Sequence, residues 1–200
     1  MNYYLWTREE DDRSLAWIMS TPAFLMDHPK EYQLYEGVSV RSWWLREPVV
    51  YNLSDERGIR LSDAIPCVGH DIIVSEELKR LLEERSGADI EFLSVRILNQ
   101  KQRLVPEPYF LMNLLGTVDC VDLERSKFKR SAIRPDLIST FYLLVLDESR
   151  IPADKKLFRL KHSPKLVVIR EDLGREILDA GCDGMFFLDL EEYGKEWGRR

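Results

Sequence analysis

The chain has 200 residues, of which 44% are hydrophobic, 32% are charged and 10% are aromatic. This composition excludes a disordered, collagen-like or membrane-embedded chain, and the length is enough to bury a core without a disulfide or a metal. The formal net charge of −6 argues against a protein that coats DNA or RNA with a generally basic surface.

The beginning of the chain is loosely patterned and rich in tryptophan. We expect strands over residues 3–6 and 49–53 and a short helix over residues 12–20. Trp43 and Trp44 are adjacent. If they lie in an extended segment, their side chains point to opposite faces, so one packs in the core and the other lies at the surface or at an interface. Tryptophan is enriched at binding hot spots, although core packing is its commoner role.

An internal repeat is found when the sequence is shifted by 95 positions against itself. Residues 72–78 then fall on residues 167–173. Each copy has the pattern of a strand, a helix with an acidic first turn, a turn with glycine and a second strand. The sequence thus predicts two similar strand–helix–strand units, at about 71–97 and 166–190. Both a duplication and two independent uses of a common local pattern explain the match.

Short strands with few long helices favour an α+β fold with mixed and antiparallel sheets over a doubly wound parallel sheet. We expect a single domain over residues 1–200, in which a tryptophan-rich part over 1–60 precedes a core over 61–200. Further strands are expected in the middle of the chain, over residues 91–98, 109–112 and 138–146.

Charge is unevenly divided along the chain. Residues 1–95 carry 10 basic and 18 acidic side chains (−8), residues 96–170 carry 15 and 8 (+7), and residues 171–200 carry 4 and 9 (−5). The most basic run is residues 125–130, reinforced by Arg134. A nucleic-acid site would prefer more interleaved aromatic side chains. We therefore expect a solvated loop that contacts an acidic neighbour, and no direct binding of nucleic acid.

The sequence contains no catalytic motif that we recognise. No nucleophile motif accompanies the three histidines, and the glycines form no phosphate-binding loop, so we expect no cofactor. Cys67 and His70 have the C-x-x-H spacing of two zinc ligands. A structural zinc site needs a second pair, and Cys120 and Cys182 are solitary. We therefore expect no metal and no catalytic residue.

Four carboxylates keep an enzyme hypothesis open. In that hypothesis Asp119, Asp122, Asp147 and Glu148 converge to bind a divalent metal or to perform acid–base chemistry on a small substrate or a nucleotide. A capped turn before Pro152 is the better explanation of the last two.

Three observations indicate the cellular compartment of the protein. Residues 1–8 lack the basic and apolar pattern of a signal peptide, and the longest apolar run, residues 141–146, is far shorter than the roughly 20 residues of a membrane helix. Three widely spaced cysteines are typical of free thiols in a reducing compartment. We therefore expect a cytoplasmic protein with no membrane contact.

The order of segments from Asp63 onward resembles a bacterial family, first defined as a domain of unknown function and later assigned as immunity proteins of polymorphic toxin systems. The strongest matching segments are Tyr109–Asp122 and Asp147–Leu160, and the resemblance covers about 130 of the 200 residues. Residues 1–60 match only loosely, through the spacing from Gly37 to Trp43.

The resemblance implies a binding protein rather than an enzyme. An immunity protein binds the toxin domain encoded beside it and blocks its activity in the producing cell, and the family has no established catalytic residues. An acidic inhibitor is attracted to a basic toxin. The expected partner-binding residues are Glu9, Glu10, Asp11, Asp12, Trp43 and Trp44. An adaptor that loads a toxin for secretion is a further alternative. The toxin and the oligomeric state stay open.

Overall fold

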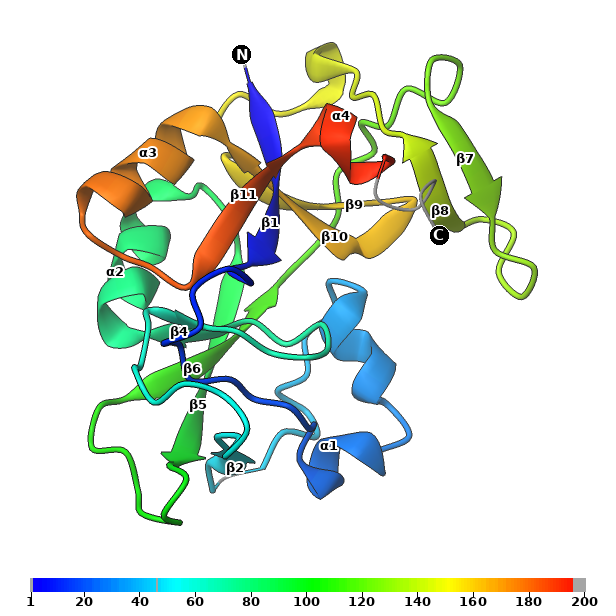
Figure 1. Ribbon diagram of the computed structural model, residues 1–200. Coiled ribbons are helices and arrows are strands. Elements are labelled where there is room, and N and C mark those ends of the chain that lie inside the picture. The colour runs from blue at the N-terminus through cyan, green and yellow to red at the C-terminus, as the bar shows by residue number, and fades with distance from the viewer. Residues whose placement is uncertain (1, 46, 196–200) are drawn as a thin grey trace.

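The computed structural model describes residues 2–45 and 47–195 and has an α+β fold (Figure 1). The strands are β1 (Tyr3–Arg8), β2 (Val49–Asn52), β3 (Ala64–Ile65), β4 (Ile73–Ser75), β5 (Ile90–Leu98), β6 (Tyr109–Leu114), β7 (Lys127–Arg130), β8 (Ile138–Leu143), β9 (Leu157–Leu160), β10 (Ser163–Arg170) and β11 (Met185–Asp189). The helices are α1 (Ala23–Met26), α2 (Glu76–Arg85), α3 (Glu171–Asp179) and α4 (Leu190–Tyr193), with short 3₁₀ helices η1 (Glu31–Tyr35) and η2 (Glu148–Arg150).

The strands form two larger sheets and a separate hairpin. The first sheet has the order β11-β1-β10-β9 and is antiparallel throughout. The second has the order β2-β5-β6-β4-β3 and is mixed, because β2 runs parallel to β5. The expected α+β class with mixed and antiparallel sheets is therefore confirmed. In Figure 1 the two sheets lie one above the other, and α2 and α3 lie side by side at one edge.

Both predicted strand–helix–strand units are present, as β4-α2-β5 and β10-α3-β11. In each unit the two strands are parallel and are separated by an antiparallel strand from elsewhere in the chain, β6 in the first and β1 in the second. An edge strand, β3 or β9, completes each copy. The strand register keeps the shift of 95 positions, in two rows of paired residues: Ile73–Leu111–Leu93 and Val168–Leu5–Leu188.

The two helices use the same positions to face the core. Ser75 caps α2, because its hydroxyl accepts the amide hydrogen of Leu78 at 3.2 Å. Leu78 and Leu82 of α2 are fully buried, and so are Leu173 and Ile177 at the equivalent positions of α3. All four belong to one apolar cluster between the sheets. Apolar residues at such a spacing lie on one face of a helix, and that face packs against the core.

The units also hold each other through backbone hydrogen bonds. Ala64, at the start of β3, donates to the carbonyl oxygen of Asp183 in the turn after α3, at 2.9 Å. Lys156, just before β9, donates to the carbonyl oxygen of Ser86 after α2, also at 2.9 Å. The chain that leads into each edge strand thus binds the turn of the other unit.

The helix expected over residues 12–20 is wrong. Residues 15–18 are all buried and extended, and Ile18 forms isolated β-bridges with Leu53 and with Cys67. An amphipathic helix buries one face only, so four consecutive buried residues are better accommodated by an extended segment packed on both sides.

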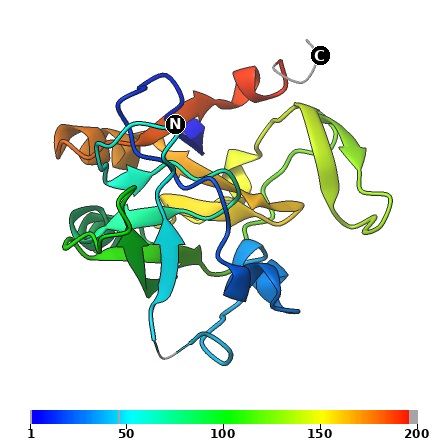
Figure 2. The same ribbon diagram turned by 60° about the horizontal axis from the view of Figure 1, so that its bottom comes forward.

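The loop expected for the basic run of residues 125–130 is wrong over residues 127–130, which form strand β7 and pair with β8. This hairpin stands away from both large sheets (Figures 1 and 2). The predicted acidic neighbours are present: Arg125 pairs with Asp122 at 2.6 Å, and Arg134 pairs with Glu36.

Arg159 of β9 joins three separate parts of the fold. Its side chain is almost completely buried and donates to the carbonyl oxygens of Leu114 at 2.9 Å, Pro164 at 2.8 Å and Leu34 at 3.0 Å. These acceptors belong to β6, to β10 and to η1. Burial lowers the pKa of Arg159 to about 10, so the guanidinium still carries its charge at neutral pH.

Replacing this guanidinium tests its role. In Arg159→Met three buried carbonyl oxygens lose their donors, and we expect the free energy of unfolding in urea to fall by about 3 kcal/mol. Arg96→Met, at an exposed position of β5, is the control and is expected to change stability by less than about 0.5 kcal/mol. Equal stability of the two variants would contradict this role.

Candidate functional site

Trp43 and Trp44 lie in a turn rather than in an extended segment. Both backbone amides donate to the carbonyl oxygen of Val40, at 3.0 and 2.9 Å. Both side chains are half-buried and their ring centroids lie 6.1 Å apart. The expectation of one core and one surface tryptophan is therefore wrong, since it required an extended backbone.

The two tryptophans form part of an aromatic cluster, which consists of Phe24, His28, Trp43 and Trp44. The rings of His28 and Trp43 stack with centroids 4.1 Å apart and planes 17° apart. Phe24 lies 5.6 Å from His28 and 6.4 Å from Trp43. The indole Nε1 of Trp43 donates to Gln33 Oε1 at 2.7 Å, which fixes the orientation of the ring.

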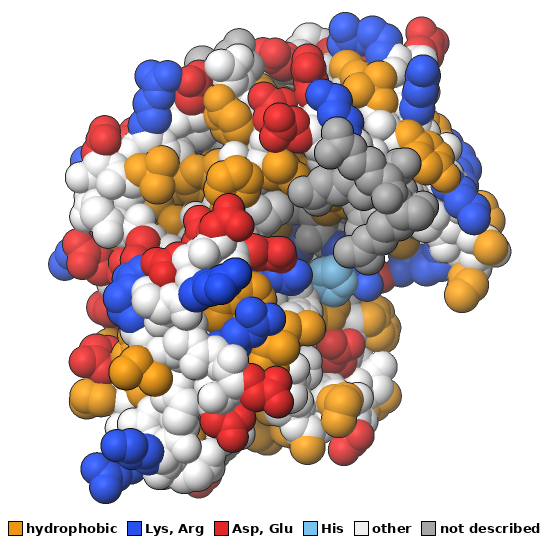
Figure 3. Space-filling view, in the orientation of Figure 1, with side chains coloured by type: hydrophobic (Ala, Val, Ile, Leu, Met, Phe, Trp, Pro, Cys, Tyr) orange, Lys and Arg blue, Asp and Glu red, His pale blue; other side chains and the backbone are white. Residues whose placement is uncertain are grey.

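Three exposed apolar side chains lie close in the sequence to residues of the aromatic cluster. Met26, Tyr32 and Leu45 are 67%, 51% and 43% exposed. Apolar side chains reach the surface in the region of α1 and η1, at the lower right of Figure 3. Half-buried aromatic rings with exposed apolar neighbours are typical of protein interfaces.

A buried carboxylate holds the turn in place. Glu91 of β5 is 3% exposed, and its oxygens accept hydrogen bonds from the Ser39 hydroxyl and, at 3.0 Å, from the Val40 amide. Arg41 approaches the same carboxylate at 3.3 Å, and the Asn113 amide nitrogen donates to it at 2.9 Å. This buried group therefore positions the segment that carries the tryptophans.

The sequence reasoning missed Glu91, although a signal was present. Glu91 alternates in phase with Leu93, Val95 and Ile97, which are all buried on the same face of β5. An acidic residue on the inward face of a strand needs a partner when it is buried.

A pocket of about 480 Å³ opens beside this carboxylate. We name it the Glu91 pocket. It is lined by Ser39, Arg41, Glu83, Ala88, Asp89, Ile90, Glu91 and Leu115.

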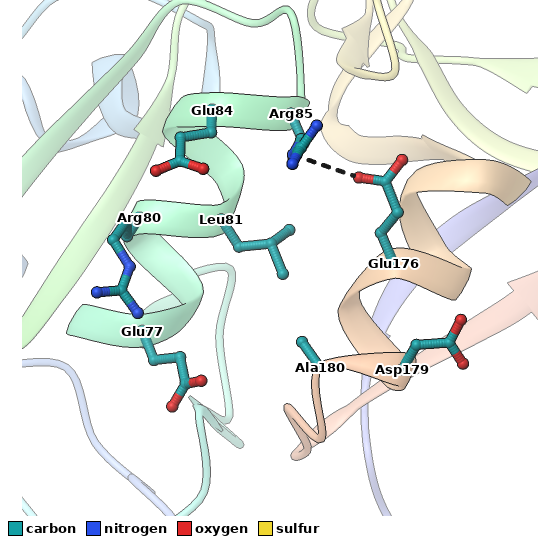
Figure 4. Close-up of a pocket in the computed structure, with 8 residues that line it drawn as sticks. All are labelled: Glu77, Arg80, Leu81, Glu84, Arg85, Glu176, Asp179 and Ala180. Atoms are coloured by element: carbon teal, nitrogen blue, oxygen red, sulfur yellow. Dashed lines mark ion pairs between the residues drawn. The ribbon is translucent and has the colours of Figure 1, made fainter.

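A groove of about 560 Å³ lies between α2 and α3 (Figure 4). Leu81 points into it, and an ion pair from Arg85 to Glu176, 3.9 Å long, spans one end. Glu77 and Asp179 lie toward the other end. Leu81 and Glu176 occupy equivalent positions of the two units, so the groove follows from their repeated architecture.

The acidic residues expected to bind a partner lie in the loop after β1. Glu10 pairs with Arg8 at 2.9 Å, and Asp12 pairs with Arg60 at 2.8 Å. The hydroxyl of Ser14 and then Arg60 lower the pKa of Asp12 to about 2.

The Glu9 carboxylate accepts the amide hydrogen of Asp11 at 2.8 Å, so a hydrogen bond within the loop also stabilises it. Figure 2 shows this loop and the turn with Trp43 and Trp44 on opposite sides of the molecule. The structure therefore does not bring the two expected contact regions together.

The carboxylates of the enzyme hypothesis are occupied by their own chain. Asp119 pairs with Arg150 at 2.9 Å and with Lys161 at 3.1 Å, and these cations lower its pKa against the opposing effect of burial. Asp122 and Asp147 accept backbone amides of their own turns. Glu148 lies in η2. Over residues 2–45 and 47–195, no three His, Cys, Asp or Glu side chains gather closely enough to hold a metal ion.

Cys67 and His70 each contact a different group. The buried Cys67 thiol donates to the Ile65 carbonyl oxygen at 3.3 Å, and burial raises its pKa. His70 packs edge-on against Tyr35, 5.4 Å between ring centroids. The nearby Asp71 accepts the Tyr35 hydroxyl at 3.0 Å, and burial raises the pKa of Asp71.

None of the helices in the described part of the chain is long and apolar enough to cross a membrane. A search of curated proteins finds no match to this chain. A family described as "Immunity protein family (Imm11)" matches residues 15–192, a range that includes the aromatic cluster, the Glu91 pocket and both repeated units. The predicted resemblance to immunity proteins of toxin systems is thus confirmed, and the chain belongs to the Imm11 immunity protein family.

Proposed function

We propose that this protein binds a cognate toxin domain in the cytoplasm of the bacterium that makes the toxin, and that it neutralises the toxin by direct association. The observation that carries the proposal is the family match over residues 15–192. The occupied carboxylates Asp119, Asp122 and Asp147 agree with an inhibitor that acts by binding rather than by catalysis.

The aromatic cluster is the proposed centre of the toxin interface. Rings that are half-buried in the free protein have part of their position fixed before binding, so association orders fewer side chains. Trp43 is held by its stack with His28 and by the hydrogen bond to Gln33. Such anchored aromatic residues are those whose truncation costs most at interfaces.

The acidic loop is proposed to act mainly on the rate of encounter. Glu10 and Asp12 pair with Arg8 and Arg60, which reduces the negative electrostatic potential of the loop. Asp11 is exposed and has no ion pair among the described residues. Exposed charges at a distance from an interface change association rates and their salt dependence more than the lifetime of a complex.

Co-expression tests the function. Cells that produce the toxin domain encoded beside this gene are expected to form colonies only when this chain is also produced, and the two proteins are expected to co-purify. An adaptor would co-purify with an active toxin and would not restore growth. If the chain neither binds the domain nor restores growth, the immunity function is wrong.

Truncation of the anchored tryptophan tests the interface. In Trp43→Ala the stack and the indole hydrogen bond are lost, and we expect the dissociation constant for the toxin domain to rise at least about tenfold by calorimetry. Tyr142→Ala, at an exposed aromatic position of β8, is the control and is expected to leave affinity within about twofold. Unchanged affinity in Trp43→Ala would exclude this surface.

Charge reversal tests the acidic loop. Replacing Glu9, Glu10, Asp11 and Asp12 by lysine is expected to weaken binding at low salt, chiefly through a slower association rate in stopped-flow measurements. A second variant replaces only Glu10 and Asp11 by lysine. It keeps the Asp12–Arg60 ion pair, so a slower association rate in this variant cannot be attributed to the loss of that pair. The control replaces two exposed glutamates of α4, residues 191 and 192, by lysine, which changes the net charge as much as the double variant does. An unchanged rate would remove the loop from the encounter.

A further inference from the structure

We propose that the open edge of β11 receives an extended, basic segment of the toxin domain, which adds a strand to the first sheet. The inference rests on the proposed function and identifies a second contact of the toxin and its chemistry. It is carried by the unpaired backbone of β11, by the apolar side chains on both faces of that edge, and by the negative charge at its beginning.

The outer edge of β11 has no strand beside it in the described part of the chain. β11 is the last strand in the order of the first sheet and pairs only with β1. The equivalent strand of the other unit, β5, pairs on its outer side with β2. An open strand edge is a template for pairing with another chain, and natural proteins usually cover it.

The strand register shows which backbone groups lie at this edge. The Glu9 amide donates to the Gly184 carbonyl oxygen at 3.2 Å, at the end of the β1–β11 ladder. Pairs that exchange hydrogen bonds alternate with pairs that do not in an antiparallel ladder, so Phe186 and Leu188 bind β1 through their backbones and Phe187 does not. The N–H and C=O groups of Phe187 therefore point outward, toward the position of an added strand.

Both faces of the edge carry apolar side chains that the protein leaves partly uncovered. Phe186 is 48% exposed on one face. Phe187 points to the opposite face, where its half-buried ring packs close to Gly174 of α3. Leu178 follows one turn after Gly174 on the same side of α3 and is 54% exposed. Figure 3 shows apolar side chains over α3 and β11. An added strand covers both faces, because its own side chains alternate.

The other unit shows that a chain segment covers the equivalent position. Glu91 of β5 corresponds to Phe186, and the segment with Ser39 and Val40 binds it. In the second unit the ring of Phe186 stays at the surface. A polypeptide segment therefore matches this edge, as in complexes where an extended peptide adds a strand to a sheet.

Negative charge at the beginning of β11 favours a basic segment over a second copy of this chain. The acidic loop joins β11 there through the Glu9 amide. Antiparallel pairing of two β11 strands brings the exposed Asp189 of each copy to the acidic loop of the other, and like charges oppose that contact. Lysine or arginine of a toxin segment is instead attracted to this end. The carboxylates around it outnumber the guanidiniums: Glu9, Glu10, Asp11, Asp12 and Asp183 against Arg8, Arg13 and Arg60.

Hydrogen exchange at single amides tests the added strand. In the free, full-length chain we expect the Phe187 amide to exchange at least about tenfold faster than those of Phe186 and Leu188 by NMR, since it has no acceptor in the sheet. Saturation with the toxin domain is expected to slow exchange at Phe187 at least about tenfold. The amide of Ile133, at the tip of the β7–β8 hairpin, is the control and is expected to keep its rate.

The outcomes of this experiment separate the two proposals. A slow Phe187 amide in the free chain, or an unchanged rate in the saturated complex, overturns the added strand and leaves the immunity function standing. Failure of the toxin domain to bind the wild-type chain overturns both.

Truncation of the exposed side chains tests the same edge. In Leu178→Ala/Phe186→Ala we expect the dissociation constant for the toxin domain to rise about tenfold by calorimetry. Ile133→Ala/Tyr142→Ala, at positions that are 92% and 53% exposed on the hairpin, is the matched control and is expected to stay within about twofold. In Figure 2 β11 lies on the side opposite the tryptophans, so the loss is expected to add to that of Trp43→Ala. Unchanged affinity in the double variant overturns the edge contact.

A photo-crosslink identifies the occupant. Benzoylphenylalanine in place of Phe186 keeps an aromatic ring at the edge, and mass spectrometry of the irradiated complex locates the residues that it reaches. We expect a single extended segment of the toxin domain that contains lysine or arginine. A crosslink only to a second copy of this chain, a toxin segment without basic residues, or no crosslink in a complex that forms overturns the proposed occupant.

Discussion

The buried guanidinium of Arg159 is the interaction that joins the two large sheets to each other and to η1. It lies on β9 of the first sheet and donates to a carbonyl oxygen of β6 in the second sheet and to another in η1. Its three hydrogen bonds offset the cost of removing a charge from water. Because η1 precedes the turn with Trp43, the same contact fixes the aromatic surface against both sheets.

The proposed partner surface lies where the repeated architecture is broken. The two units match in strand order and register, but β2 and the segment that packs with it have no counterpart in the second unit. At the position equivalent to Glu91 the second unit carries Phe186, which is 48% exposed. The same site of the fold thus carries a covered carboxylate in one unit and an uncovered ring in the other.

Much of the fold was predictable because its signals are local. The pattern of residues 91–98 predicted β5, and the repeated strand–helix–strand pattern predicted α2 and α3. The candidate site was predictable only in part. The two tryptophans were expected to bind a partner, but the segment before them is held by hydrogen bonds from Val40 to Glu91 and from Asn113 to Val38, which span 51 and 75 positions. No local pattern encodes such a pairing.

The position of β1 has a consequence for synthesis. This strand fills the space between β10 and β11, and Arg8 pairs with Met185. One of the two inner strands of the first sheet thus leaves the ribosome early, and both of its edges are paired only after residue 189 has been made. Such long-range pairing folds slowly and leaves an open strand in the meantime. A chain that ends before residue 185 therefore lacks the complete first sheet, because β1 has no partner on its β11 side.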